Sequence, residues 1–361
     1  MERQNKGVKK ALIFDPYLDT LGGGERYSLT FALALSYLGY RVDLAWNNEA
    51  DIQAAQDRFS LDLSQININR EAYTLFARKT SLIDRIIFTS SYDLFFWVSD
   101  GSLPFLFGKK NLVHFQVPFT RIGGNQFTNA LKLLFINRIV YNSEFTRSMI
   151  EKSLPRARGF VLYPPVAVDN FLPGKKEKLI LSVGRFDSPS HSKRQDILID
   201  AFRVFSSQTK GYRLVLAGGF RGDRQIIDSL KEQAKGLSVE VVPNLGFDKL
   251  KSLYARAQFF WHAAGYGADE EKEPEKVEHF GITTAEAMSA GCVPIVIAKG
   301  GQKEIVISGS GELVNSPEEM ARSTAKIIRE KSYARYSQKA VSRSSRFSQD
   351  IFIKRVSDLL Q

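Results

Sequence analysis

The chain has 361 residues, of which 43% are hydrophobic and 25% are charged, as in an ordinary globular protein. This length is enough for two domains that each bury a core of their own. No apolar run approaches the ~20 residues that a membrane span requires, and the polar N-terminal stretch predicts no signal peptide. Because Cys292 is the single cysteine, the sequence excludes an internal disulfide and favours a cytoplasmic protein.

The first half of the chain alternates between predicted strands and helices. A continuous apolar segment at 10–14 predicts a strand of a parallel sheet, because such strands are covered on both faces. A helix over about 25–38, ended by Gly39, and a strand at 41–46 complete a βαβ unit. Further strands are predicted at 92–98, 111–115 and 138–142, and Ser143 is the predicted N-cap of the helix that begins at Glu144.

Two features of this half have both a structural and a functional interpretation. Gly22 and Gly23 lie in the turn after the first strand, where glycine either makes a tight turn or lets backbone amides approach a ligand. The glycines do not spell G-x-G-x-x-G, so no dinucleotide fingerprint is present. His114 stands near the end of the strand 111–115, and a lone histidine there is either a buried core residue or part of a site.

The formal net charge of +11 is concentrated in one region. Residues 101–168 carry nine Lys or Arg against two Glu, a net +7, with aromatic and aliphatic residues between them. Three interpretations remain open: a solvated basic surface over an ordinary core, a patch that faces anionic lipid, or a nucleic-acid surface. No recognised nucleic-acid-binding motif accompanies the charge, so we expect no nucleic acid.

A stretch rich in proline and charge at 164–178 marks a domain boundary, and a second α/β series begins at residue 179. Strands are predicted at 179–183, 213–217, 239–242 and 259–261, and helices at 195–205, 223–234 and 247–255. Gly184 and Arg185 follow the first of these strands, Gly219 follows the second, and Leu245 follows the third. We therefore predict domains at 1–168 and 169–345, with a C-terminal helix over 346–361.

The stretch Glu278-His279-Phe280-Gly281-Ile282-Thr283-Thr284-Ala285-Glu286 carries the most chemistry. Thr283 is the predicted N-cap of a helix over 284–290, and amides at such a helix start can cradle a phosphate. Glu278 and Glu286 beside the cradle could accept hydrogen bonds from sugar and ribose hydroxyls. In the alternative interpretation, Thr283 and Glu286 form a capping box that only stabilises the helix.

This stretch resembles the E-x7-E signature of retaining glycosyltransferases of family 4, the group 1 glycosyltransferases, which have the GT-B fold. The family more often has glycine at the position of His279. A histidine there, and the segment Gly22-Gly23-Gly24-Glu25-Arg26, resemble the mannosyltransferases that act on lipid-linked oligosaccharides. Gly184-Arg185 and Lys193 are similar to the family's Gly-Arg…Lys pair, although the loop between them is longer here.

The resemblance implies an α/β protein with two Rossmann-like domains that face a cleft, the last helix crossing back to the N-terminal domain. It implies that a hexose of the mannose or glucose type passes from a GDP- or UDP-sugar to a hydroxyl acceptor in the assembly of a polysaccharide or glycolipid, with a lipid-linked acceptor as one alternative. The implied catalytic residues are Arg185, Lys193, Glu278 and His114. The implied donor-binding residues are Gly22, Gly23, Gly219, Leu245, His279, Phe280, Gly281, Ile282, Thr283 and Glu286.

No cofactor is expected, and the absence of an Asp-x-Asp motif predicts that no metal holds the diphosphate. Arg185 and Lys193 would neutralise the leaving group instead. Two other kinds of protein remain alternatives: a GT-B-fold sugar-nucleotide epimerase, and a protein that binds sugar nucleotides without turning them over. The basic region predicts contact with the inner face of an anionic membrane.

Overall fold

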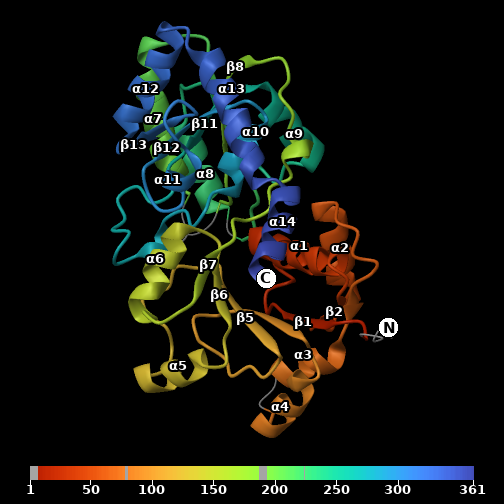
Figure 1. Cartoon of the computed structure of the whole chain (residues 1–361). Helices are drawn as coiled ribbons and strands as arrows, with labels where there is room; N and C mark the ends of the chain where they lie inside the picture. Colours follow the sequence, from red (N-terminus) through yellow and green to blue (C-terminus); the bar gives the residue numbers. More distant parts are fainter. Residues whose placement is uncertain (1–6, 78–79, 187–192, 223) are drawn as a thin grey trace. The chain divides into compact units, whose positions relative to one another are not determined.

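The computed structural model describes residues 7–77, 80–186, 193–222 and 224–361. The chain divides into two compact units, one formed by residues 1–165 together with 349–361 and the other by residues 166–348 (Figure 1). Each unit contains one parallel sheet with helices packed against it. Among the described helices, none combines the length and the apolar character needed to cross a bilayer.

The N-terminal unit contains a seven-stranded sheet in the order β3-β2-β1-β4-β5-β6-β7. Apolar side chains cover both faces, which explains why β1 and β4 are apolar without alternation. Its strands are β1 (Lys10–Phe14), β2 (Arg41–Leu44), β3 (Asn67–Ile68), β4 (Leu94–Val98), β5 (Lys110–Phe115), β6 (Arg138–Tyr141) and β7 (Gly159–Val161). Its helices are α1 (Gly23–Tyr37), α2 (Glu49–Phe59), α3 (Arg70–Ala77), α4 (Leu82–Ser90), α5 (Gln126–Leu133), α6 (Glu144–Ser153) and α14 (Gln349–Leu360).

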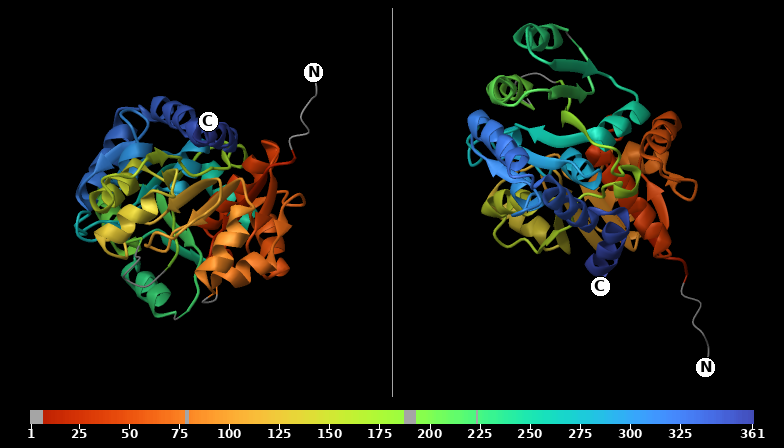
Figure 2. Two further views of the ribbon diagram at one scale, coloured as in Figure 1. Left: turned by 60° about the horizontal axis from the view of Figure 1, so that its bottom comes forward. Right: turned by 90° about the horizontal axis from the view of Figure 1, so that it is seen from above.

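Helix α14, at the end of the chain, packs against α1 of this unit (Figure 2). The Phe352 ring meets the edge of the Tyr27 ring at a centroid distance of 5.0 Å, and Val356 and Leu359 are buried in the same core. The predicted N-cap of helix α6 is confirmed, because the Ser143 side chain accepts a hydrogen bond from the Thr146 amide.

The C-terminal unit contains a six-stranded sheet in the order β10-β9-β8-β11-β12-β13. The order reverses between β8 and β11, the kind of switch point beside which ligands bind in open α/β sheets. Its strands are β8 (Glu177–Val183), β9 (Arg213–Gly218), β10 (Val239–Pro243), β11 (Ala257–His262), β12 (Val293–Ile297) and β13 (Glu312–Val314). Its α-helices are α7 (Gln195–Gln208), α8 (Gln225–Gln233), α9 (Phe247–Arg256), α10 (Ile282–Ser289), α11 (Gln302–Ile305), α12 (Pro317–Arg329) and α13 (Tyr333–Ser344).

The predicted N-cap of α10 is wrong. The helix begins at Ile282, so Thr283 lies inside its first turn and Gly281 is the N-cap. Gly281 has a φ of 116°, a left-handed conformation that glycine adopts without strain. The capping-box interpretation therefore fails as well, because the side chain of a residue inside the helix cannot cap its start.

Candidate functional site in the C-terminal unit

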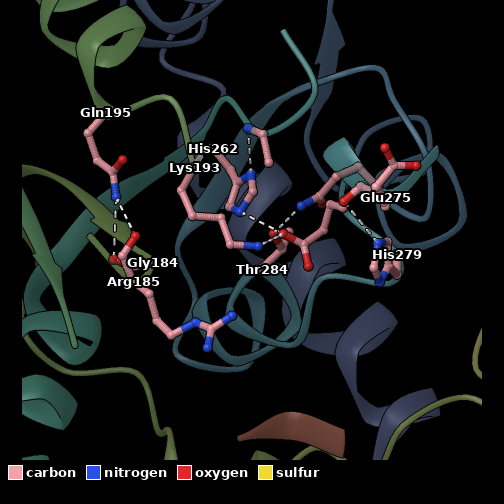
Figure 3. Close-up of polar contacts among 11 residues, drawn as sticks. Gly184, Arg185, Lys193, Gln195, His262, Glu275, His279 and Thr284 are labelled. Atoms are coloured by element: carbon pink, nitrogen blue, oxygen red, sulfur yellow. Dashed lines mark hydrogen bonds and ion pairs between the residues drawn. The ribbon is translucent and has the colours of Figure 1, made fainter. Parts of the chain in front are cut away.

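The site is built around Glu278, which lies between the end of β11 and the start of α10. Lys193 Nζ donates to Glu278 Oε2 at 2.8 Å, and His262 Nε2 lies 3.1 Å from the same oxygen. In Figure 3 the dashed contacts of Lys193 and His262, which come from different segments, meet at one oxygen atom, and the two distances above identify it as Glu278 Oε2. The three side chains are 15%, 26% and 2% exposed for Glu278, Lys193 and His262, so the cluster is largely shielded from water.

The proton on His262 can be placed from its second nitrogen. Nδ1 accepts a hydrogen bond from the Ala264 amide at 3.2 Å, so in the neutral ring the proton resides on Nε2 and faces Glu278. Burial by itself raises the pKa of Glu278, but the Lys193 ammonium and the His262 hydrogen bond outweigh it and hold that pKa well below its usual range. The carboxylate is therefore ionised at neutral pH.

Lys193 is held in place by the loop that follows β8. A Cβ atom on Gly184 would lie 2.7 Å from Lys193 Cγ, so the lysine side chain passes directly over the glycine. The Arg185 carbonyl accepts a hydrogen bond from Gln195 Nε2 at 3.1 Å, which links this loop to α7. The neighbouring cation, Arg194, is bound elsewhere, to Asp196 and to the Tyr266 carbonyl. Residues 187–192, which precede Lys193, lie outside the described residues.

The first turn of α10 presents a mixed surface. Ile282, Thr283 and Glu286 are partly exposed, whereas Thr284 and Ala285 are buried. Because residues four apart lie on one helix face, Ile282 and Glu286 share the accessible side. Glu286 Oε2 accepts a hydrogen bond from the Tyr254 hydroxyl at 3.1 Å, and burial, with Glu286 beside it, raises the pKa of Tyr254 well above its usual value.

The loops after β9 and β10 are joined to each other. The Asn244 side chain accepts from the Phe220 amide at 2.8 Å and donates to the Phe220 carbonyl at 3.1 Å. Gly219 lies in the first of these loops, and a Cβ atom there would approach Arg185 Cγ at 3.9 Å. Leu245 lies in the second loop and lines an open cavity of about 390 Å³ together with residues 243–249.

The N-terminal unit holds the remaining predicted residues. Gly22 is the N-cap of α1 and Gly23 its first residue, and the Gly22 amide donates to the Glu25 carboxylate at 2.5 Å. His114 is fully buried at the end of β5, where its ring stacks on Tyr27 at a centroid distance of 4.1 Å. Its Nδ1 donates to the Val140 carbonyl at 3.1 Å, and burial lowers the pKa of His114 to about 3. The ring is therefore neutral at physiological pH.

Gln116, two residues further on, was not predicted. A Cβ atom on Gly24 would overlap the Gln116 side-chain amide, so Gln116 lies against the first turn of α1. Within the described part of the chain, neither His114 Nε2 nor Gln116 Oε1 has a hydrogen-bond partner. Both atoms are acceptors that a hydroxyl group could satisfy.

Sequence reasoning also missed residues of the C-terminal unit. His262 and Tyr254 contact the two glutamates, and Gly301 donates its amide to the Glu278 carbonyl at 2.8 Å. A Cβ atom on Gly301 would overlap the backbone of residues 279–280, so only glycine allows this approach. The adjacent Gly300-Gly301 pair after a buried strand was a signal that could have been used. No group of three or more His, Cys, Asp or Glu in the described residues is arranged to hold a metal ion.

Solved structures with this architecture define the class of the fold. A glycosyltransferase from Rickettsia africae ESF-5 aligns with a TM-score of 0.74 at 16% identity, covering 98% of each chain. The Anabaena protein HepE, solved in complex with UDP and glucose, aligns with a TM-score of 0.70 at 17% identity, covering 98% of this chain and 99% of its own. The protein thus has the α/β GT-B fold of glycosyltransferases, as the sequence predicted.

Residues 168–343, within the C-terminal unit, match the family Glycosyl transferases group 1. A GDP-Man:Man(3)GlcNAc(2)-PP-Dol alpha-1,2-mannosyltransferase from Dictyostelium discoideum is 27% identical over 269 residues, 64% of this chain and 51% of the relative. Mannosylfructose-phosphate synthase from Agrobacterium fabrum is 32% identical over 152 residues, 40% of this chain and 30% of the relative. The chain thus spans about half or less of the length of the curated relatives described here.

Proposed function

We propose that the protein is a retaining hexosyltransferase that moves a sugar of the mannose or glucose type from a nucleoside diphosphate to a hydroxyl group of a lipid-linked acceptor. The observation that carries the proposal is the cluster of Lys193, His262 and Glu278 beside the start of α10, within a group 1 glycosyltransferase domain. The name of the Dictyostelium discoideum relative supports a GDP-mannose donor and a lipid-linked acceptor, and HepE, also solved in complex with UDP-glucose, supports a UDP-sugar as the alternative donor.

In this proposal the diphosphate lies at the start of α10. The amides around Gly281 and the positive end of the helix dipole favour an anion there. Arg185 and Lys193 supply the positive charge that stabilises the departing diphosphate, whose negative charge grows in the transition state. Glu286 accepts hydrogen bonds from the ribose hydroxyls.

Glu278 is assigned to the hydroxyls of the transferred sugar. Its low pKa keeps it an acceptor at all physiological pH values, which suits hydroxyl donors. The Glu278 carboxylate also holds the Lys193 side chain over Gly184 before the donor binds. Less conformational entropy of Lys193 is therefore lost when the donor binds. The leaving phosphate accepts the proton of the acceptor hydroxyl, so no protein base is required.

Gly22, Gly23 and His114 of the N-terminal unit are proposed to contact the donor. The neutral His114 ring cannot act as a cation, and its role is to accept a hydroxyl hydrogen bond at Nε2. We also propose that the reaction needs no metal, because Arg185, Lys193 and the helix start supply the positive field that a metal would otherwise provide.

The test is a thermal-shift panel of GDP-mannose, UDP-glucose, ADP-glucose and the free nucleotides, followed by transfer assays with lipid-linked acceptors. A donor at 100 times its Kd should stabilise the C-terminal unit by about 2.7 kcal/mol. Glu286→Ala should abolish this shift, whereas the matched control Tyr254→Phe, which removes only the hydroxyl that Glu286 accepts from, should retain most of it. NMR of the product should show the anomeric configuration of the donor.

Each failure has a different meaning. Conversion of the donor sugar in the absence of any acceptor would identify an epimerase. Tight donor binding without turnover across the acceptor panel would identify a binding protein. No stabilisation by any sugar nucleotide would overturn the proposed function.

A further inference from the structure

Two helices of the N-terminal unit turn large apolar side chains toward solvent. Helices α4 and α5 cover the same face of the sheet, because Phe88 of α4 and Leu133 of α5 pack against one shared core cluster. Both helices lie at the same end of this unit, which the left view of Figure 2 turns forward. We define the α4–α5 surface by its exposed apolar residues: Leu82, Ile83, Ile87, Phe127, Leu131, Leu134 and Phe135.

The exposure on α5 is a consequence of how the helix is oriented. Phe127, Leu131 and Leu134 recur at the spacing of one helix face, and Phe127 and Leu134 are 82% and 79% exposed. The buried residue of the helix is polar: Asn129 donates its side-chain amide to the Gly123 carbonyl at 3.2 Å, while Leu133 is partly buried against the core. The helix thus buries an asparagine and exposes most of its large apolar side chains, unlike an ordinary surface helix.

The segment around α5 carries only positive formal charge, whereas α4 contains Asp84 and Arg85. Residues 101–143 contain five Lys or Arg and no Asp or Glu. Lys109 pairs with Asp93, while Arg121 and Arg138 flank α5 and are exposed. Lys132 lies on α5 itself, with its ammonium 5.4 Å from the centre of the Phe105 ring. Exposed apolar patches with a charged rim mark interaction surfaces.

We propose that the α4–α5 surface docks on an anionic lipid bilayer. Apolar side chains would enter the boundary between headgroups and acyl chains, and the cations would contact anionic headgroups. A second copy of the chain fits less well, because a symmetric contact around α5 would bring the cations of residues 101–143 against themselves, and Asp84 is the single acidic residue on the two helices. The proposal does not depend on sugar transfer, because the docking assay needs neither donor nor acceptor.

The experiment is co-sedimentation of the full chain with vesicles of phosphatidylcholine alone, or with about one third phosphatidylglycerol, across a salt series. We expect binding to the anionic vesicles that weakens with salt, since exposed charges are screened over ~8 Å at physiological ionic strength. Phe127→Ser combined with Leu134→Ser should lower the partition coefficient about 10-fold or more, because both side chains lose their transfer into the bilayer. Arg121→Gln combined with Arg138→Gln should reduce the salt-dependent part, because two of the five cations are removed.

The matched control is Leu172→Ser combined with Ile307→Ser, which removes exposed apolar side chains of the C-terminal unit, 65% and 47% exposed. It should bind vesicles like the unaltered chain. Since the replaced side chains are exposed, Tm should not change, and a Tm measurement checks this. Negligible sedimentation of the unaltered chain with both vesicles, or equal losses in the test and control variants, would overturn the proposal. A dimer that Phe127→Ser dissociates, without vesicle binding, would assign the surface to self-association instead.

Discussion

Replacing Glu278 by glutamine tests the electrostatic core of the site. The change keeps the size and shape of the side chain but removes the charge that Lys193 and His262 face. At 2.8 Å the attraction between two unit charges is about 6 kcal/mol for an effective dielectric constant of 20. Removing one partner of a buried pair typically costs about 3–5 kcal/mol. The side chains of Glu278 and Lys193 are partly exposed, so water weakens their attraction. We therefore expect Glu278→Gln to lower the free energy of unfolding by about 2–3 kcal/mol at pH 7.

The loss of unfolding free energy caused by Glu278→Gln should depend on pH. The pKa of Glu278 in the folded protein lies well below the ordinary value of 4.5, so the stabilisation is fully present above pH 4.5. It is lost as the pH falls through the folded-state pKa. Below pH 4.5 the difference in unfolding free energy between the unaltered protein and Glu278→Gln should therefore shrink, by up to about 1.4 kcal/mol per pH unit.

The assay is urea unfolding followed by the fluorescence of Trp261, which is fully buried in the C-terminal unit. The other two tryptophans, Trp46 and Trp97, belong to the N-terminal unit and are replaced by phenylalanine in all proteins compared. A double-mutant cycle of Glu278→Gln with Lys193→Met isolates the interaction. A coupling energy near zero, or a difference that does not change below pH 4.5, would refute the reasoning.

Three further predictions concern neighbouring features. Arg185→Ala should lower kcat about 10²-fold by removing positive charge from the leaving diphosphate; turnover equal to that of the unaltered protein would exclude Arg185 from the site. Gly218→Ala should lower the free energy of unfolding by about 1–3 kcal/mol, because the new Cβ would overlap the Gly184 carbonyl. In the control Gly219→Ala the nearest atom lies 3.9 Å from the new Cβ, so Tm should not change. Equal shifts of Tm in the two variants would contradict this account. Sugar transfer should survive excess EDTA, and recovery of activity only with Mn²⁺ or Mg²⁺ would show that a metal is required.

The E-x7-E stretch shows how far local patterns reach. Its helix follows from short-range rules, and the structure contains it as α10. The cap was assigned to Thr283 because threonine is a favoured N-cap residue. Gly281 takes that position because the loop of Gly300 and Gly301 packs against the backbone of residues 278–280, which sets the path of the chain into the helix. A local rule cannot include a neighbour that lies about twenty residues away.

The partners of Glu278 could not be predicted for a related reason. Lys193 lies 85 positions before Glu278 in the sequence, and the two meet because β8 and β11 are adjacent in the sheet. His262 ends β11 without any motif that would distinguish it from a buried core histidine. Helices α2 to α4 were also not predicted.

By itself the sequence determined the alternation of strands and helices, the two α/β halves, and the motifs that place residues 168–343 among the group 1 glycosyltransferases. These properties depend on periodicity, glycine and capping chemistry, which act over a few residues. The tertiary structure decided which charges meet, which residue caps α10, and which face of α5 is exposed. These depend on the order of strands in each sheet and on the packing of distant segments, because electrostatic and apolar contacts act through space and not along the chain.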